Sequence, residues 1–263
     1  MNICDTFQNL ARQTWINLEY GRNAGHQLLE ETITDINLLH LKLQHPEVIT
    51  VSFNKSEEGK NGADWEWWFY DFSGNWVGFR IQAKVLDFRT RGFNQLYYHK
   101  DKSSLSQCDK LIVNAKLDPK HPRLPFYVLY LEDDILPDLT VHPTVTDIRT
   151  FGCSVVSAYQ IKDLKSTKTT NLSDWDAELL PWKNLVCDSR ERPFMDVSTM
   201  LEVIKERFGF QDIKGGTDYL QSSPPPYVLQ IMNSDGNYSN LEGRVPNLAG
   251  VTIVRIGEDD QDE

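Results

Sequence analysis

Hydrophobic positions follow two different periods in the first part of the chain, and each period predicts a different element. Over residues 24–44 the apolar side chains recur at helical spacing, and Pro46 would stop a helix soon afterwards. Residues 48–53 instead alternate between apolar and polar, which predicts a strand. A polar loop over residues 54–62 follows, and after it come two aromatic-rich runs separated by residues 71–75.

The same reading continues to the end of the chain. The expected elements are helices over residues 103–116, 145–164 and 196–208, and strands over residues 125–131, 227–232 and 251–256. The first six elements run helix, strand, strand, strand, helix, strand. This order predicts an α/β fold with a mixed central β-sheet flanked by helices.

Length and composition predict one domain. The 263 residues are 40% hydrophobic, enough for a sizeable core. We expect this core over residues 24–165, a C-terminal extension of unassigned role over residues 166–263, and a solvated acidic tail over residues 258–263. No stretch reaches the roughly 18 apolar residues of a membrane span, and the N-terminus lacks the apolar centre of a signal peptide. We therefore expect a soluble cytoplasmic protein without a membrane partner.

Cysteine and histidine spacing argues against a structural metal or a disulfide framework. The four cysteines, Cys4, Cys108, Cys153 and Cys187, show no CxxC pairing, so we expect them to be reduced. The six histidines show neither the His-x-His nor the His-x-x-x-His spacing of zinc sites.

The segment over residues 62–87 predicts a β-hairpin with one polar face. A turn centred on Gly74 would place Asp64 opposite Lys84 and Glu66 opposite Gln82. The alternate positions carry Trp65, Trp67, Phe69, Val77, Phe79, Ile81, Ala83 and Val85, which would form the core face.

The polar face of this hairpin contains the residue types of a metal-dependent phosphodiesterase. Asp64 and the amide oxygen of Gln82 could ligate a hard divalent cation. Lys84 could activate water or stabilise charge in the transition state. Two alternatives remain: an ordinary half-exposed hairpin with a cross-strand Asp64–Lys84 pair, and a non-catalytic module that binds nucleic acid or protein.

The order of elements together with Asp64 and the Gln82-Ala83-Lys84 strand resembles the PD-(D/E)XK nuclease superfamily, in the Mrr-type variant that has Gln in place of Glu. The resemblance covers residues 24–131 and implies a restriction-endonuclease-like αβββαβ core. It implies a Mg²⁺- or Mn²⁺-dependent endodeoxyribonuclease, used for bacterial defence against foreign DNA. By the same resemblance Glu31, or Glu30 beside it, completes the metal site, and Gln107 resembles a polar residue that some members add. Glu66 is additional to the pattern; it would ligate metal or pair with Arg80 or Lys84.

Charge is the main argument against a nucleic-acid partner, since the formal net charge is −11. The balance reverses locally, because residues 80–102 carry six basic residues against two acidic ones. The basic residues that we expect to contact nucleic acid are Arg80, Arg89, Arg91, Lys100 and Lys102. DNA is the expected substrate. RNA cleavage is an alternative, as is assembly into a homo-oligomer or with a partner protein of a defence system.

Overall fold

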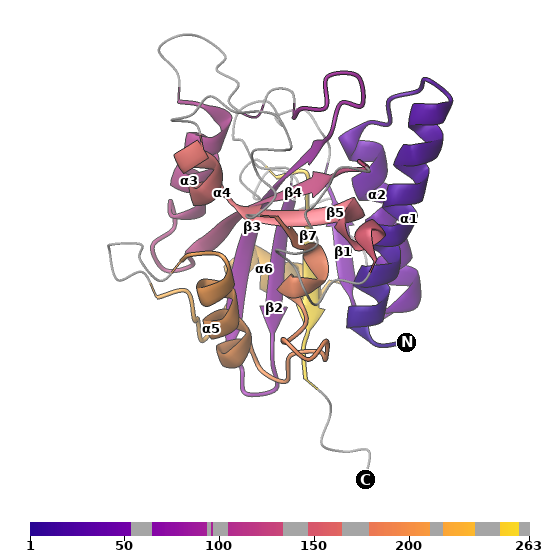
Figure 1. The fold of residues 1–263 in the computed structure, drawn as a ribbon. Helices are drawn as coiled ribbons and strands as arrows, with labels where there is room; N and C mark the ends of the chain where they lie inside the picture. Colours follow the sequence, from indigo (N-terminus) through magenta and orange to yellow (C-terminus); the bar gives the residue numbers. More distant parts are fainter. Residues whose placement is uncertain are drawn as a thin grey trace.

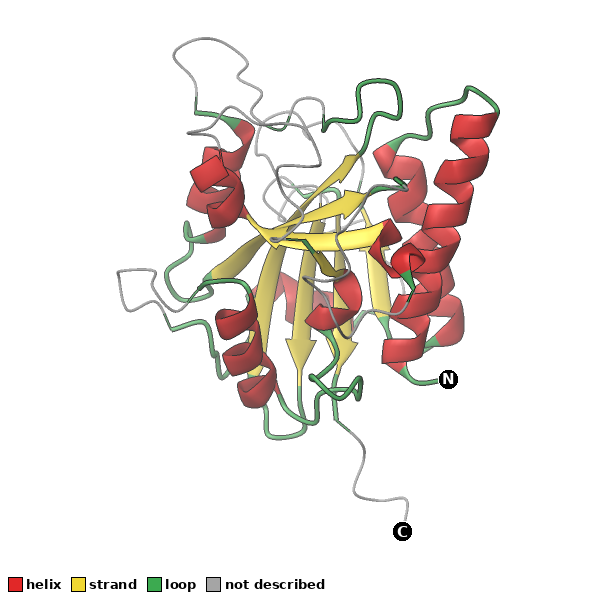
Figure 2. Ribbon diagram, viewed as in Figure 1, coloured by secondary structure: helices red, strands yellow, loops and turns green. Residues whose placement is uncertain are grey.

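A single mixed β-sheet with helices on both faces forms the protein (Figures 1 and 2). The computed structural model describes residues 1–53, 65–93, 96, 105–133, 147–164, 179–210, 218–234 and 248–257. Within these ranges the α-helices are α1 Ile3–Asn23, α2 Glu30–Gln44, α3 Gln107–Ala115, α4 Ala158–Leu164, α5 Val197–Arg207 and α6 Pro226–Met232. The strands are β1 Ile49–Ser52, β2 Trp65–Tyr70, β3 Trp76–Val85, β4 Arg123–Tyr130, β5 Cys153–Ser157, β6 Leu180–Pro181 and β7 Gly250–Arg255. Two 3₁₀ helices, η2 Ile148–Gly152 and η5 Trp182–Leu185, complete the elements discussed below.

The sheet order is β1-β7-β2-β3-β4-β5-β6, which confirms the predicted mixed α/β class. Strands β2 and β3 form the antiparallel hairpin, whereas β3 pairs with β4 and β2 pairs with β7 in parallel. Strand β7 comes from the part of the chain that we expected to extend the core, and it lies between β1 and β2. As a result β1, β3 and β4 end at the edge of the sheet where β2 and β7 begin; we call this the β3 C-terminal edge.

The helix predicted over residues 24–44 begins at residue 30 in the structure. A further helix, α1, precedes it and was not predicted. Helix α1 ends at Asn23, and α2 begins at Glu30, so residues 24–29 connect two helices. The side chain of Asn2 caps α1 by accepting a hydrogen bond from the backbone N–H of Asp5. The buried residues of α1 are Cys4, Thr6, Phe7, Leu10, Ala11, Thr14, Trp15 and Leu18, which recur at helical spacing.

Two other segments adopt a structure different from the predicted one. The helix expected over residues 145–164 is the 3₁₀ helix η2, the strand β5 and the short helix α4. The strand expected over residues 227–232 is helix α6, which begins with Pro226 at its first position. Helices α3 and α5 and strands β1, β4 and β7 confirm their predictions.

Both faces of the central strands are buried. Helices α1, α2 and α5 pack on one face, and α3, α4 and α6 pack on the other, as the positions of α5 and α6 on opposite sides of the sheet show (Figure 1). All ten residues of β3 except Val85 are buried. A sheet covered on both faces explains why its polar side chains must be paired inside the protein.

The hairpin register differs from the predicted one by two residues. Glu66 lies opposite Arg80, not Gln82, and Trp65 lies opposite Ile81. The turn runs from Asp71 to Asn75, and the Asp71 side chain accepts a hydrogen bond from the Asn75 backbone N–H. A shift of two keeps every side chain on its predicted face. The assignment of the aromatic face to the core is therefore confirmed, but the polar face is buried as well.

The expectation of four reduced cysteines is wrong for one pair. Cys4 of α1 forms a disulfide with Cys187, and their Cα atoms are 5.8 Å apart. The two residues are 183 positions apart in sequence, so no spacing rule could have paired them. Cys108 and Cys153 are free and buried, and burial raises the pKa of the Cys153 thiol to about 12. Among the described helices, none is both long enough and apolar enough to cross a membrane.

Candidate active site

Lys84 and Glu30 meet at the β3 C-terminal edge. Lys84 Nζ donates a hydrogen bond to Glu30 Oε1 at 3.0 Å, and their side chains are 6% and 26% exposed. Lys84 is the second-last residue of β3, and Glu30 is the first residue of α2. The end of a strand and the start of a helix thus place an ammonium group and a carboxylate in direct contact.

The position of Glu30 changes its acid–base properties. Burial raises the pKa of Glu30 above its ordinary value, while the charge and hydrogen bond of Lys84 oppose this shift. The neighbouring carboxylate of Glu31 raises the pKa further, and the backbone N–H of Val85 donates a hydrogen bond that lowers it. Glu31 is exposed. The structure therefore brings Glu30, rather than the preferred candidate Glu31, into contact with Lys84.

Gln82 lies two residues before Lys84 on the same face of β3. It is buried and pairs with Tyr127 of β4 in the sheet. Gln107, the first residue of α3, is partly buried, and its helix packs against β3 and β4. Asp64 lies outside the described residues, directly before the start of β2. Within the described ranges no three His, Cys, Asp or Glu side chains are grouped as a metal site.

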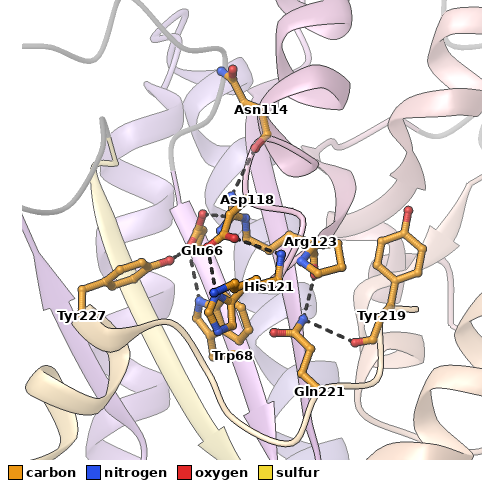
Figure 3. Close-up of polar contacts among 11 residues, drawn as sticks. Glu66, Trp68, Asn114, Asp118, His121, Arg123, Tyr219, Gln221 and Tyr227 are labelled. Atoms are coloured by element: carbon orange, nitrogen blue, oxygen red, sulfur yellow. Dashed lines mark hydrogen bonds and ion pairs between the residues drawn. The ribbon is translucent and has the colours of Figure 1, made fainter. Parts of the chain in front are cut away.

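Glu66 lies on the same face of the sheet as Gln82 and Lys84, but it belongs to a separate buried cluster. Figure 3 shows part of this cluster. Its carboxylate accepts a hydrogen bond from Arg80 Nη1 at 3.0 Å and forms an ion pair with Arg123 Nε at 3.2 Å. Trp68 Nε1 donates to it at 3.2 Å, and the Tyr227 hydroxyl donates to the same oxygen. Glu66 is 1% exposed. Of its two predicted roles, metal ligation and pairing with a basic residue, the structure shows the pairing with Arg80. These contacts occupy both carboxylate oxygens, which argues against Glu66 as a metal ligand.

The predicted basic residues divide into buried and exposed ones. Arg80 is 3% exposed and bound to Glu66, so its assignment to a nucleic-acid surface is wrong. Arg89 is exposed and lies 4.8 Å from the centre of the Phe88 ring. Arg91 is half-exposed, and its Nε donates to Asp133 Oδ2 at 2.7 Å. Lys100 and Lys102 lie outside the described residues.

Two carboxylates that the sequence analysis did not consider lie at the same edge. Glu132 and Asp133 follow β4 after one intervening residue, Leu131, and both are buried. Arg22 Nη2 pairs with Glu132 Oε1 at 2.9 Å, which ties the end of α1 to the end of β4. The signal was present in the sequence, because three acids, residues 132–134, come directly after an apolar strand. Such a run is unusual beside a buried strand unless the acids are paired.

A pocket of about 330 Å³ opens between α2 and the sheet beside the Lys84–Glu30 pair. We call it the α2 pocket. Its lining is Glu30, Glu31, Thr34, Asp35, Leu38, Leu39, Lys42, Thr50, Ser52, Phe53, Trp65, Ala83 and Ala249. Glu30 therefore both lines the pocket and contacts Lys84.

The fold and this edge define a mixed α/β protein with a buried lysine–carboxylate pair next to a pocket. By sequence, the chain belongs to DUF6615, a family of unknown function whose profile matches residues 3–260. Comparisons with curated proteins and with solved structures found no match.

Proposed function

We propose that the protein is a Mg²⁺-dependent nuclease whose active site lies at the β3 C-terminal edge. The observation that carries this proposal is the contact between Lys84 and Glu30. Lys84 lies two residues after Gln82 on β3. The end of this central strand carries a buried lysine, a carboxylate in contact with it and a nearby amide. These are the residue types expected from the resemblance to the PD-(D/E)XK superfamily.

The donor set is chemically suited to a hard cation. Gln82 offers an amide oxygen, Glu30 and Glu31 offer carboxylates, and Asp64 is the further ligand predicted from sequence. Of the two glutamates that the resemblance offers to complete the metal site, we propose Glu30 in place of Glu31, because Glu30 contacts Lys84. Mg²⁺, or Mn²⁺, would supply the Lewis acidity that activates water and stabilises charge on the phosphate.

In this proposal Lys84 has two roles that its surroundings favour. Its ammonium group neutralises Glu30 at the edge of the core, and this holds the side chain in one position. When a phosphodiester approaches, the same ammonium group can orient the attacking water or stabilise the negative charge of the transition state. DNA as the main polymer and a role in defence are proposals that rest on the resemblance. A cytoplasmic location is a proposal that rests on the sequence pattern alone.

The test is a cleavage assay of the purified protein. Supercoiled plasmid, linear duplex DNA, single-stranded DNA and RNA are incubated with Mg²⁺, with Mn²⁺ or with EDTA. We expect cleavage with metal, none with EDTA, and none from Lys84→Met. Lys183→Met is the matched control, because Lys183 is also largely buried and pairs with Glu191 at 2.6 Å, but from η5. Metal-independent binding without cleavage of any polymer would instead favour a non-catalytic module.

A further inference from the structure

A tryptophan with defined contacts, Trp65, is among the residues that line the α2 pocket. The Trp65 ring lies against Gly250 of β7, where an added Cβ would come within 2.2 Å of the ring. Its indole Nε1 donates to Thr252 Oγ1 at 2.8 Å, and Thr252 Oγ1 is 3.2 Å from Thr50 Oγ1. Gly250 and the Thr252 hydroxyl therefore hold the Trp65 ring in place, which lowers the entropy that its ordering would cost on binding.

The walls combine apolar side chains with carboxylates. Leu38, Leu39, Phe53, Ala83 and Ala249 supply the apolar part. The charged lining residues are three acidic ones, Glu30, Glu31 and Asp35, and one basic one, Lys42. The lining therefore has a formal charge of −2 (one minus three). This lining disfavours a phosphate inside the pocket and favours a flat apolar group that carries N–H donors.

The size of the pocket limits its occupant. A volume of about 330 Å³ lies near the lower end of the range for small-molecule sites, so it has room for one base and not for a duplex with its two backbones. A base can enter such a pocket only when it is unpaired and unstacked. Among the bases, adenine, cytosine and guanine present exocyclic amino donors, whereas uracil and thymine present carbonyl oxygens and a single ring N–H.

We propose that the α2 pocket binds one unpaired nucleobase that carries an exocyclic amino group. This inference rests on the proposed function and specifies its substrate class as single-stranded nucleic acid. Trp65 and Phe53 contact the base, the carboxylates accept hydrogen bonds from its amino group, and the phosphate stays outside the pocket on the side of Lys84. Glu30 joins the two parts of the site, because it contacts Lys84 and also lines the pocket.

Nucleoside binding tests the pocket without any cleavage. Adenosine, cytidine, guanosine, uridine and their deoxy forms are titrated by calorimetry into the full-length protein in EDTA. We expect cytidine, adenosine and guanosine to bind about tenfold more tightly than uridine, the effect of about one hydrogen bond to a charged group. A ribose form that binds more tightly than its deoxy form would favour RNA over DNA. Equal affinity for cytidine and uridine, or no binding of any nucleoside, would overturn the inference.

Two variants separate the pocket from the catalytic pair. Leu39 is 56% exposed, so Leu39→Trp fills the pocket without disturbing the core, and we expect it to remove binding of every nucleoside. Asp35→Leu removes one acceptor and should lower the affinity for cytidine about tenfold while leaving uridine unchanged. Glu202→Met, at an exposed position of α5 outside the pocket, is the control and should bind as the wild type does. Wild-type binding by Leu39→Trp would contradict the proposal.

The inference and the proposed function can fail independently. Selective nucleoside binding that Leu39→Trp removes, in a protein that cleaves no polymer with Mg²⁺, supports the pocket and contradicts the nuclease. Cleavage that needs Lys84 but prefers duplex over single-stranded DNA supports the nuclease and overturns the inference. If both are right, Leu39→Trp should cleave single-stranded DNA at least about tenfold more slowly than Glu202→Met does.

Discussion

Lys84 and Glu30 are 54 residues apart in sequence, yet Lys84 Nζ lies 3.0 Å from Glu30 Oε1 at the end of the central strand β3. Neither group is free in water: the lysine side chain is 6% exposed, and burial raises the pKa of the glutamate. The pair therefore connects a helix start to a strand end through one charged contact. The predictions below test what this contact does for stability and for catalysis.

Lys84→Met should abolish cleavage and also destabilise the fold, because it leaves the Glu30 carboxylate partly buried without its partner. We expect a loss of about 1–3 kcal/mol, below the cost of breaking a fully buried pair since Glu30 retains some contact with water. Urea unfolding of Lys84→Met, Glu30→Gln and the double variant measures the coupling. A double variant whose loss equals the sum of the single losses would show that the pair does not interact.

Glu30 should make stability depend on pH in a defined direction. Its pKa in the folded protein lies above the ordinary 4.5, so the folded state binds the proton more tightly than the unfolded state does. The contribution of Glu30 to the free energy of unfolding is therefore fully present below pH 4.5. It is lost as the pH rises through the pKa of Glu30 in the folded protein. Glu30→Gln cannot titrate. Relative to wild type, its unfolding free energy should increase as the pH rises above the ordinary pKa of 4.5; a decrease would contradict the raised pKa.

Glu66→Gln should unfold the protein far more readily than Tyr227→Phe does. Glu66 is the partner of two buried arginines, and leaving such charges unpaired costs about 3–5 kcal/mol. Tyr227→Phe removes one hydrogen bond to a charged acceptor, about 1.5–3 kcal/mol. Burial beside Glu66 raises the pKa of Tyr227, so this hydroxyl stays a donor at neutral pH. Denaturant midpoints give the ranking, and a stable Glu66→Gln with lost Mg²⁺ affinity would return Glu66 to the metal site.

Asp64→Asn should weaken the binding of Mg²⁺ or Mn²⁺, because a neutral amide is a poorer ligand for a hard cation than a carboxylate. Calorimetric titration of wild type and variant with each metal measures this. Asp71→Asn is not a suitable control, since Asp71 caps the start of α5 by accepting from the Val197 backbone N–H. Glu202→Met serves instead. Equal metal affinities for wild type and Asp64→Asn would place the metal on other ligands.

The sequence predicted the order of the elements because each central element has a strong period of its own. Helix α2, strands β1 to β4 and helix α3 follow the predicted sequence from residue 24 to residue 131. Helix α1 was missed although Phe7, Leu10, Ala11, Trp15 and Leu18 recur at helical spacing, because threonines interrupt the apolar stripe. Strand β5 was missed because its pairing with β4 overrides a segment that also fits a helix. Helix α6 was missed because seven residues are too few to show a helical period.

The candidate site was predictable in its residue types but not in its surroundings. Alternation along the hairpin placed Glu66, Gln82 and Lys84 on one face, as the structure does. Alternation cannot tell whether that face meets water or another layer, since the layer here comes from α3, α4 and α6. The second partner of Glu66 could not be read from local sequence, because Arg123 is 57 residues away. Similarly, the choice of Glu30 over Glu31 depends on how the start of α2 meets the end of β3.

Gln82 provides the most direct test of a metal site at the end of β3. In the observed register Glu66 lies opposite Arg80. A carboxylate introduced at position 82 would therefore not lie directly opposite the Glu66 carboxylate and be repelled by it. Gln82→Glu keeps an oxygen ligand and adds a charge, while Gln82→Leu keeps the size and loses the oxygen. The measurement is the nicking rate of both variants with Mg²⁺, alongside their melting temperatures. A metal site requires an active Gln82→Glu and an inactive but folded Gln82→Leu; an inactive Gln82→Glu beside an active Gln82→Leu would contradict it.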